Sequence, residues 1–238
     1  MNVGQAIELI RADYLDDNYN TGSSDDLVSD AQLIRWLAEA EFEACRRKDL
    51  LFDDTTPTDS SAVPLTRITV VANKVKYPFS QRVTRIDAIH YISALGRRHP
   101  LKHVNREWLD RHMPNRAIRY GTPQVYQVRG RHLYLYPIPF EAAELHLDVY
   151  RVPLEEVAEV TDTFAVDEEW HVGLTHWCPY RAFMNLDEDI EDARRQHFFY
   201  SKFAETFGPA LPAAVRRIIL EEPESIETQP LGYTSCRY

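Results

Sequence analysis

Apolar residues near the start of the chain recur every three or four positions, which is the spacing of one face of an α-helix. The first such stretch covers residues 4–15, and a polar loop rich in Asp, Asn, Gly and Ser separates it from a second. Ser29 is a good N-cap for the second helix, which is predicted over 30–49. The apolar stripe of that helix comprises Leu33, Trp36, Leu37, Ala40 and Ala44.

The middle of the chain changes to the short, alternating patterns that are typical of β-strands. Residues 100–104 are expected to pair back onto one of these strands, and a short helix in 105–114 is stopped by Pro114. Together the strands predict an antiparallel sheet. The predicted strands cover 67–71, 83–92, 124–128, 132–136 and 144–153.

Two of these strands form a hairpin in RYGTPQVYQVRGRHLYLYPIP, residues 119–139. Prolines and a glycine mark its entry and exit, and they limit any slip of the strand register. Arg129, Gly130 and Arg131 form its tip. The hairpin holds no catalytic set. We interpret its tip as a rigid docking element that meets an acidic patch on a neighbouring copy or on a partner protein.

After Pro153 the pattern is helical again. A helix begins at Asp167 and should kink at Pro179, and a second helix runs over 187–208 and ends at Gly208. A short segment follows, and the last residues, from 221, lack periodicity and are predicted to form an extended tail. The expected buried face of the second helix comprises Phe198, Phe199, Phe203 and Phe207.

This order of elements predicts an α+β fold, in which a helical bundle from the N- and C-terminal parts carries an inserted antiparallel β-sheet region and an extended C-terminal tail. The expected divisions are N-terminal helices over 1–60, the β-rich region over 61–155, C-terminal helices over 156–220 and a C-terminal arm over 221–238.

The composition, 44% hydrophobic and 27% charged, is that of an ordinary globular protein with a real core. No apolar run approaches the roughly 20 residues that cross a bilayer. The first residues lack a secretory signal. We therefore expect that the protein is made in the cytoplasm and does not associate with a membrane. Cys45, Cys178 and Cys236 are too few and too far apart for a disulfide framework.

Charge is unevenly spread along the chain, whose net charge is −10. Residues 1–81 hold 8 basic and 14 acidic side chains, 82–131 hold 11 basic and 3 acidic, and 132–238 hold 8 basic and 20 acidic. A basic middle between acidic flanks favours contact between copies of the chain over direct binding of nucleic acid.

Motifs for catalysis are not found. The chain has 8 glycines and no glycine-rich phosphate loop, and Glu107 beside Trp108 is weak evidence for a glycosidase carboxylate. His171 and His176 lie five residues apart, about 140° around a helix, so with Cys178 they make a poor metal site. We expect no catalytic residue, no cofactor and no metal.

The order of the motifs resembles the head–tail adaptor proteins, also called connector or gateway proteins, of tailed bacteriophages. The helix pattern D-x-x-L-x-x-W-L-x-x-A-x-x-E-x-x-R at 30–46 is followed by VTRIDAI at 83–89 and then by the hairpin. A strand ending in Tyr150 and Pro153 comes next, and then the pattern W-H-x-G-L-x-H-W-C-x-Y-R-A-F at 170–183 and a second helix. Pro179 departs from the family pattern.

The resemblance implies a structural, non-enzymatic virion protein of the tail or neck, assembled in the host cytoplasm. It implies a homo-oligomeric ring of twelve copies beneath the portal protein. The opposite end of the ring would receive a tail nozzle, tail tube or tail-terminator protein, which the hairpin tip would contact if it does not meet a neighbouring copy. Double-stranded DNA would pass through without specific binding. The C-terminal arm would contact the portal through Pro230, Leu231, Tyr233, Arg237 and Tyr238.

Two alternatives stay open. One is a cell-wall hydrolase carried in the virion, which needs a pair of carboxylates in a cleft. The other is a DNA-binding protein that uses the basic middle region, whose tyrosines could stack on bases. Aromatic residues on strands are more often core or subunit contacts. These tyrosines are Tyr120, Tyr126, Tyr134 and Tyr136.

Overall fold

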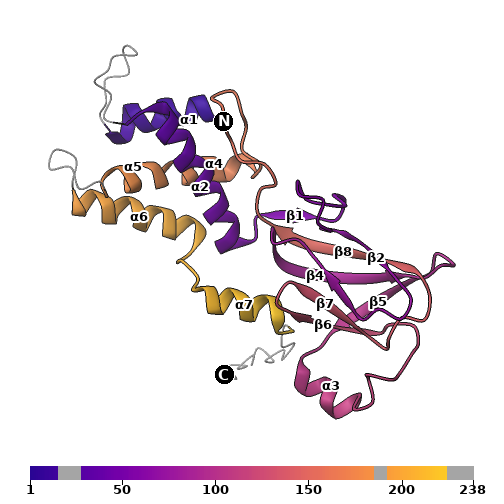
Figure 1. The fold of residues 1–238 in the computed structure, drawn as a ribbon. Helices are drawn as coiled ribbons and strands as arrows, with labels where there is room; N and C mark the ends of the chain where they lie inside the picture. The colour runs from indigo at the N-terminus through magenta and orange to yellow at the C-terminus, as the bar shows by residue number, and fades with distance from the viewer. Residues whose placement is uncertain (16–27, 185–191, 224–238) are drawn as a thin grey trace, which may run out of the picture.

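The computed structural model describes residues 1–15, 28–184 and 192–223, and Figure 1 shows a group of helices beside a curled sheet. The predicted C-terminal tail lies outside the described residues, apart from its first three. The helical part contains α1 (Val3–Leu9), a π-helix η1 (Ile10–Leu15), α2 (Asp30–Lys48), α4 (Glu168–Thr175), α5 (Trp177–Ala182) and α6 (Ala193–Phe207). The sheet part contains β1 (Leu51–Asp53), β2 (Arg67–Val70), β3 (Lys76–Pro78), β4 (Val83–Ile92), β5 (Arg98–His103), α3 (Arg106–His112), β6 (Val125–Arg129), β7 (His132–Tyr136), β8 (Ala143–Arg151) and α7 (Ala213–Glu221).

Helix α2 forms as its sequence predicts. Ser29 caps it, and the Gln32 side chain in turn accepts from the Ser29 backbone N–H, which completes a capping box. All five residues of the predicted apolar stripe are buried, and they pack against α1, α4 and α5. This contact forms the core of the helical part, which also buries Cys45 and Cys178.

The two C-terminal helices agree with the prediction in part. The chain separates α4 from α5 at His176, because Pro179 has no N–H to continue the hydrogen bonds of the first helix. Helix α6 begins after Asp192, and the predicted start at 187 lies outside the described residues. The prediction that Phe198 is buried is wrong. It is 54% exposed, since it stands about 100° around the helix from Phe199.

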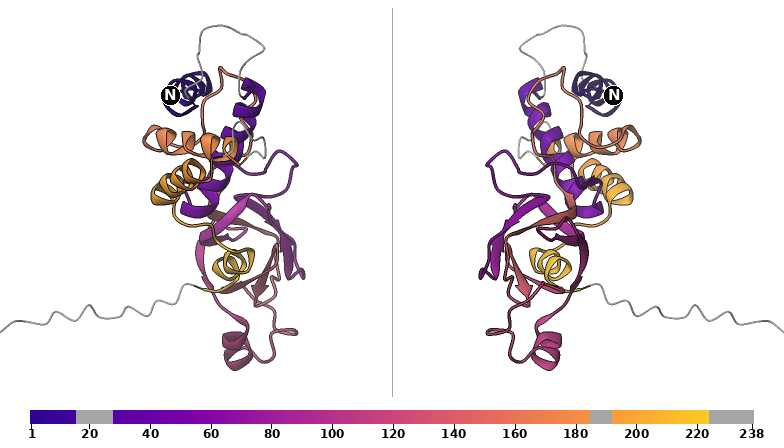
Figure 2. Two further views of the ribbon diagram at one scale, coloured as in Figure 1. Left: turned by 90° about the vertical axis from the view of Figure 1, so that its left-hand side faces the viewer. Right: turned by 90° about the vertical axis from the view of Figure 1, so that its right-hand side faces the viewer.

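The sheet has eight strands, in the order β1-β8-β4-β5-β6-β7-β3, with β2 also paired to β8. All pairs are antiparallel as predicted, except that β5 and β6 run parallel. The crossover through α3 brings the chain back in the same direction. Figure 2 shows that the sheet curls and that α7 lies at its open mouth.

Alternating residues of the strands fill a second core inside the curl. Leu145, Leu147 and Val149 on β8 are fully buried, as their period of two predicts. Leu133 and Leu135 on β7 face them across the curl. The molecule is therefore α+β, with one apolar core among the helices and another within the sheet. The domain boundaries predicted above stay a prediction.

Asp49 connects the two parts at the end of α2. Its backbone is left-handed (φ 49°, ψ 54°), a conformation that Asp tolerates better than most residues. Its carboxylate accepts a hydrogen bond from Thr84 and forms an ion pair with Arg85 at 3.2 Å, both on β4. The turn at Asp49 therefore directs the chain out of α2 and into β1.

Asp53 holds β1 on the edge of the sheet. Burial alone would raise its pKa, but hydrogen bonds from the Thr56 and Thr55 backbone and from the Arg151 guanidinium outweigh this effect. The pKa of Asp53 is lowered to about 2. Because the Asp53 side chain is only 3% exposed, solvent screens this arrangement little.

The variant Asp53→Asn is expected to lower the free energy of unfolding at pH 7 by about 2 kcal/mol, since the folded pKa lies nearly two units below that of a free aspartate. This stability is present above the ordinary pKa of Asp and is lost as the pH falls from about 4 towards 2. Urea unfolding at pH 7 and pH 3 measures both effects. Exposed Asp54→Asn is the matched control, and an Asp53→Asn protein as stable as that control would contradict the prediction.

Candidate assembly interface

The tip of the predicted hairpin is a two-residue turn. Arg129 at the end of β6 pairs with His132 at the start of β7, so that Gly130 and Arg131 form the turn itself. Gly130 has φ +61°, which favours glycine because other residues adopt it with strain. The space that a Cβ would occupy at this position is empty. The predicted hairpin is confirmed. Its docking role stays a prediction.

The three predicted tip residues have different surroundings. The Arg131 guanidinium donates to the Val83 carbonyl at 2.7 Å and lies over the Phe79 ring. Burial lowers the pKa of Arg131. Gly130 donates its N–H to a carboxylate oxygen of Glu221 on α7 at 2.8 Å. Arg129 is exposed. The tip is thus partly occupied by contacts within its own chain, whereas Arg129 is exposed to solvent.

Helix α7 closes the mouth of the sheet. Leu220 is its one buried residue, and it joins the core of the sheet. The helix packs on β4 and β6. The remaining large apolar side chains of α7 are partly exposed: Val215 at 38%, Ile218 at 54% and Ile219 at 42%. One leucine and the Glu221 contact therefore hold a helix that exposes much of its apolar surface.

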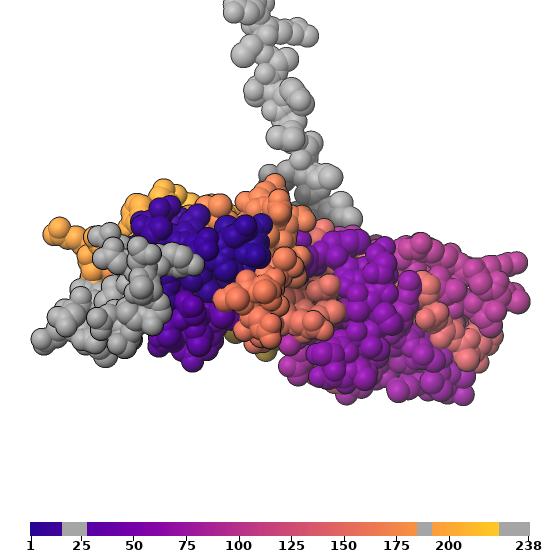
Figure 3. Space-filling view, turned by 90° about the horizontal axis from the view of Figure 1, so that it is seen from above, coloured from indigo at the N-terminus to yellow at the C-terminus, as the bar shows by residue number. Residues whose placement is uncertain are grey.

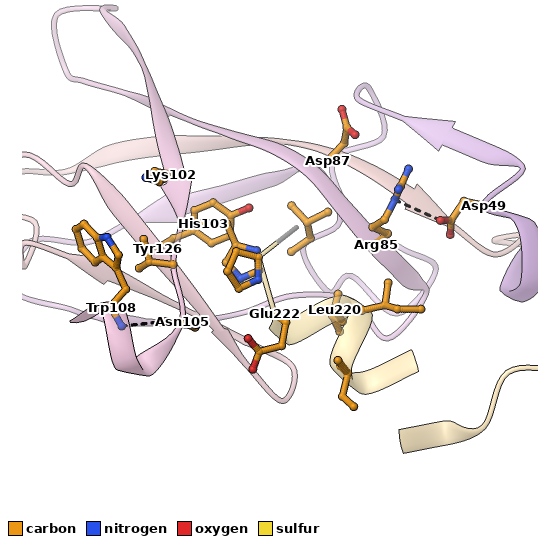
Figure 4. Close-up of a pocket in the computed structure, with 15 residues that line it drawn as sticks. Asp49, Arg85, Asp87, Lys102, His103, Asn105, Trp108, Tyr126, Leu220 and Glu222 are labelled. Atoms are coloured by element: carbon orange, nitrogen blue, oxygen red, sulfur yellow. Dashed lines mark hydrogen bonds and ion pairs between the residues drawn. The ribbon is translucent and has the colours of Figure 1, made fainter. Parts of the chain in front are cut away.

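A groove of about 850 Å³ lies between α7, β5 and α3 (Figure 4). His103 stacks flat on Tyr126 in it, with ring centres 4.7 Å apart. Burial lowers the pKa of His103 to about 4, although an interaction with the Glu221 backbone acts in the opposite direction. The imidazole is therefore neutral at pH 7 and carries no charge toward Asp87 or Lys102. Trp108 on α3 forms the outer end of the groove.

The residues considered for metal binding have separate partners. His171 contacts the Val166 carbonyl, His176 stacks on Tyr14, and the Cys178 thiol lies against the Leu33 carbonyl. Burial raises the pKa of Cys178 well above its ordinary value. Among the residues that the structure describes, no three His, Cys, Asp or Glu side chains are placed to hold a metal ion.

A second apolar surface covers the end of the sheet at which β8 begins, away from the helical part. Hydrogen bonds join the loops there, since Gly121 donates to Ile138 and Asn73 to Pro139. Large apolar side chains at this end, which we call the free end, are exposed: Val71 at 52%, Leu95 at 82%, Ile118 at 75%, Tyr120 at 59% and Phe140 at 55%. An apolar surface of this kind is typical of a contact with another protein.

Comparison with known families decides the identity. The sequence model of the family described as SU10 adaptor protein matches residues 1–219. The chain belongs to the SU10 adaptor protein family. This is a family of phage head–tail adaptors, as the resemblance of the motifs suggested. No curated protein matches the chain.

Family membership gives this SU10 adaptor its general role. It is a structural component of a phage virion that takes part in head–tail assembly with partner proteins and forms oligomers. In the described residues no helix is long and apolar enough to span a bilayer. The arm residues predicted to meet the portal, Pro230, Leu231, Tyr233, Arg237 and Tyr238, lie outside the described residues and beyond the family match.

Sequence reasoning missed the place of α7. The sequence predicts no definite element over 211–220, because a helix of nine residues gives a weak periodic signal. Its contact with the hairpin joins residues 91 positions apart in the sequence, Gly130 and Glu221. The one signal in the sequence is the pattern AAVRRIIL, in which the apolar residues Val215, Ile218 and Ile219 recur at the spacing of a helix.

Replacing Leu220 by Ala should release α7 from the mouth of the sheet, because this helix has no other buried apolar side chain. We expect hydrogen exchange at the amides of 213–221 to become at least tenfold faster. The control Ile219→Ala removes a side chain that is 42% exposed and should change the exchange little. Equal exchange in both variants would show that Leu220 does not anchor the helix.

Proposed function

We propose that this adaptor forms a ring of twelve copies between the portal of the capsid and the tail tube, nozzle or tail-terminator protein. Double-stranded DNA passes through the bore without specific binding. The observation that carries this proposal is the family match over residues 1–219. The protein has no catalytic step in this role, and its function is to fit two different partners at once.

The distribution of charge in the fold supports side-by-side assembly. Over the described residues, the helical part (1–50 and 152–211) has 9 basic and 16 acidic side chains. The sheet part (51–151 and 212–223) has 17 basic and 11 acidic ones. A ring needs heterologous contacts, in which one surface meets a different surface of the next copy. A molecule with an acidic and a basic part provides two such surfaces.

The two partners are assigned to different regions. We assign the portal to the C-terminal arm, residues 221–238, because the tyrosines near its end, Tyr233 and Tyr238, can anchor it on a partner. We assign the tail protein to the free end of the sheet, whose exposed apolar side chains need a cover. The tip residue Arg129 lies on the sheet part and is available to a neighbouring copy.

Removing residues 224–238 should abolish docking to the portal while the fold stays intact, because every described contact of α7 lies before this segment. Portal-containing heads are incubated with the full chain or with the truncated chain. Bound adaptor is then counted by gel densitometry and viewed by negative-stain electron microscopy.

The expected result is a ring beneath the portal for the full chain and no ring for the truncated one. Circular dichroism and thermal unfolding serve as the control for folding. Normal docking of the truncated chain would overturn the role of the arm. Failure of the full chain to bind portal-containing heads would overturn the proposed function itself.

A further inference from the structure

A second cavity, of about 550 Å³, opens between the end of α2, the β6–β7 turn and α7. We call it the arginine pocket. Its lining contains a single carboxylate, that of Asp49, which already pairs with Arg85. The basic side chains of its lining are Arg46, Arg47, Arg131, Arg216 and Arg217.

Most of this positive charge is not neutralised. Arg46 and Arg47 share Glu43 as their ion-pair partner. Arg131 and Arg216 donate to the carbonyls of Val83 and Leu211, which satisfy hydrogen bonds without cancelling charge. Arg217 is exposed and makes no ion pair with any described residue. The arginine pocket is therefore a strongly electropositive surface that calls for an anionic partner.

Apolar side chains make up much of the rest of the lining. Phe42, Val83 and Val152 lie on the side of α2 and β4, and Ile219 and Leu220 lie on the side of α7. A fully hydrated anion would leave these groups uncovered. A matching partner carries carboxylates next to apolar side chains.

The chain itself carries a surface of this kind in the loop after β8. We call residues 154–162 the acidic loop. Glu155, Glu156 and Glu159 are exposed on it and make no ion pair with any described residue. Val160 among them is 46% exposed. The acidic loop therefore offers three free carboxylates beside an apolar side chain.

The acidic loop is held in one conformation before any partner arrives. The Asp162 carboxylate accepts hydrogen bonds from the backbone N–H groups of Ala158 and Glu159. The start of α1 holds the loop in place, because Gly4 donates its backbone N–H to the Val160 carbonyl at 2.8 Å and Val3 donates to the Asp162 carbonyl. A preformed loop loses little conformational entropy on docking.

The acidic loop begins two residues after Val152, which lines the arginine pocket, and runs from there to α1, on the opposite side of the molecule from α7. Figure 3 shows the salmon segment after β8 exposed on the face seen from above, while α7 lies on the lower side in Figure 1. The hydrogen bonds to α1 hold Glu159 and Val160 away from the pocket of their own chain. Two different surfaces on different sides of one chain are what a heterologous ring contact needs.

We propose that the acidic loop of one copy docks into the arginine pocket of the next, and that this contact joins neighbouring copies in the ring. The inference rests on the proposed function and names the surfaces through which the copies meet. The other anion at hand is the phosphate backbone of DNA. The apolar half of the lining favours the acidic loop, because a phosphate chain has nothing to cover those side chains.

Exchange of charges between the two surfaces tests the contact. Arg217→Glu reverses one charge of the pocket, and Glu156→Arg reverses one charge of the loop; both side chains are exposed and unpaired, so the fold should be kept. Each variant alone places like charges together and should leave at least tenfold fewer adaptor copies on portal-containing heads. Exposed Arg194→Glu, on α6, is the matched control and should bind like the unmodified chain.

Restoration decides the pairing. An equal mixture of the two variants should recover binding, because copies that alternate around an even-numbered ring place opposite charges at every contact. A chain with both substitutions should recover it too.

Wild-type binding by each single variant overturns this inference and leaves the proposed function standing. Loss in both variants without recovery in the mixture also overturns it, and a matching loss of DNA affinity in Arg217→Glu would then assign the pocket to phosphate. If the unmodified chain does not bind the heads at all, the proposed function fails, and this inference falls with it.

Discussion

The junction at Asp49 fixes how the two parts of the adaptor are placed. Its left-handed backbone ends α2, and its carboxylate binds the Thr84 hydroxyl and the Arg85 guanidinium on β4. The chain crosses the junction a second time after β8, where it returns to the helical part. There Val152 donates its backbone N–H to the Arg82 carbonyl. The helices and the sheet keep separate cores, so polar contacts at this narrow junction set their relative position. Every surface assigned to a partner depends on that position.

The fold also redistributes charge in a way that sequence order does not reveal. Helix α7 belongs to the acidic C-terminal part of the sequence, yet it packs on the sheet and adds Arg216 and Arg217 to the basic part. The acidic segments from both ends of the chain come together in the helical part. The separation of an acidic and a basic part thus arises from tertiary packing. The count of charged residues in successive segments of the sequence predicted it only approximately.

Periodicity in the sequence predicted the elements that bury a face of their own. The stripe on α2 and the alternation on β8 are strong signals, because each side chain faces a core at every repeat. Strands β1 and β3 have three residues each and show no repeat, so only their pairing with β8 and β7 defines them. The arginine pocket draws its residues from α2, the hairpin and α7, and no local pattern brings those segments together. The hairpin tip was found from Gly130 alone, whereas its contact with Glu221 depends on packing over a long range.

The attachment of α7 determines where a mechanical load would enter the molecule. The described chain ends at Pro223, directly after Leu220 and Glu221, which bind the sheet core and the β6–β7 turn. A force that pulls on the chain beyond Pro223 meets these two residues before it reaches the connection to α6. The sheet, rather than the helices, would therefore bear tension on the C-terminal arm, and α6 would be shielded until α7 left the mouth of the sheet. Under such a load, α7 would detach from the sheet before the helical part was strained.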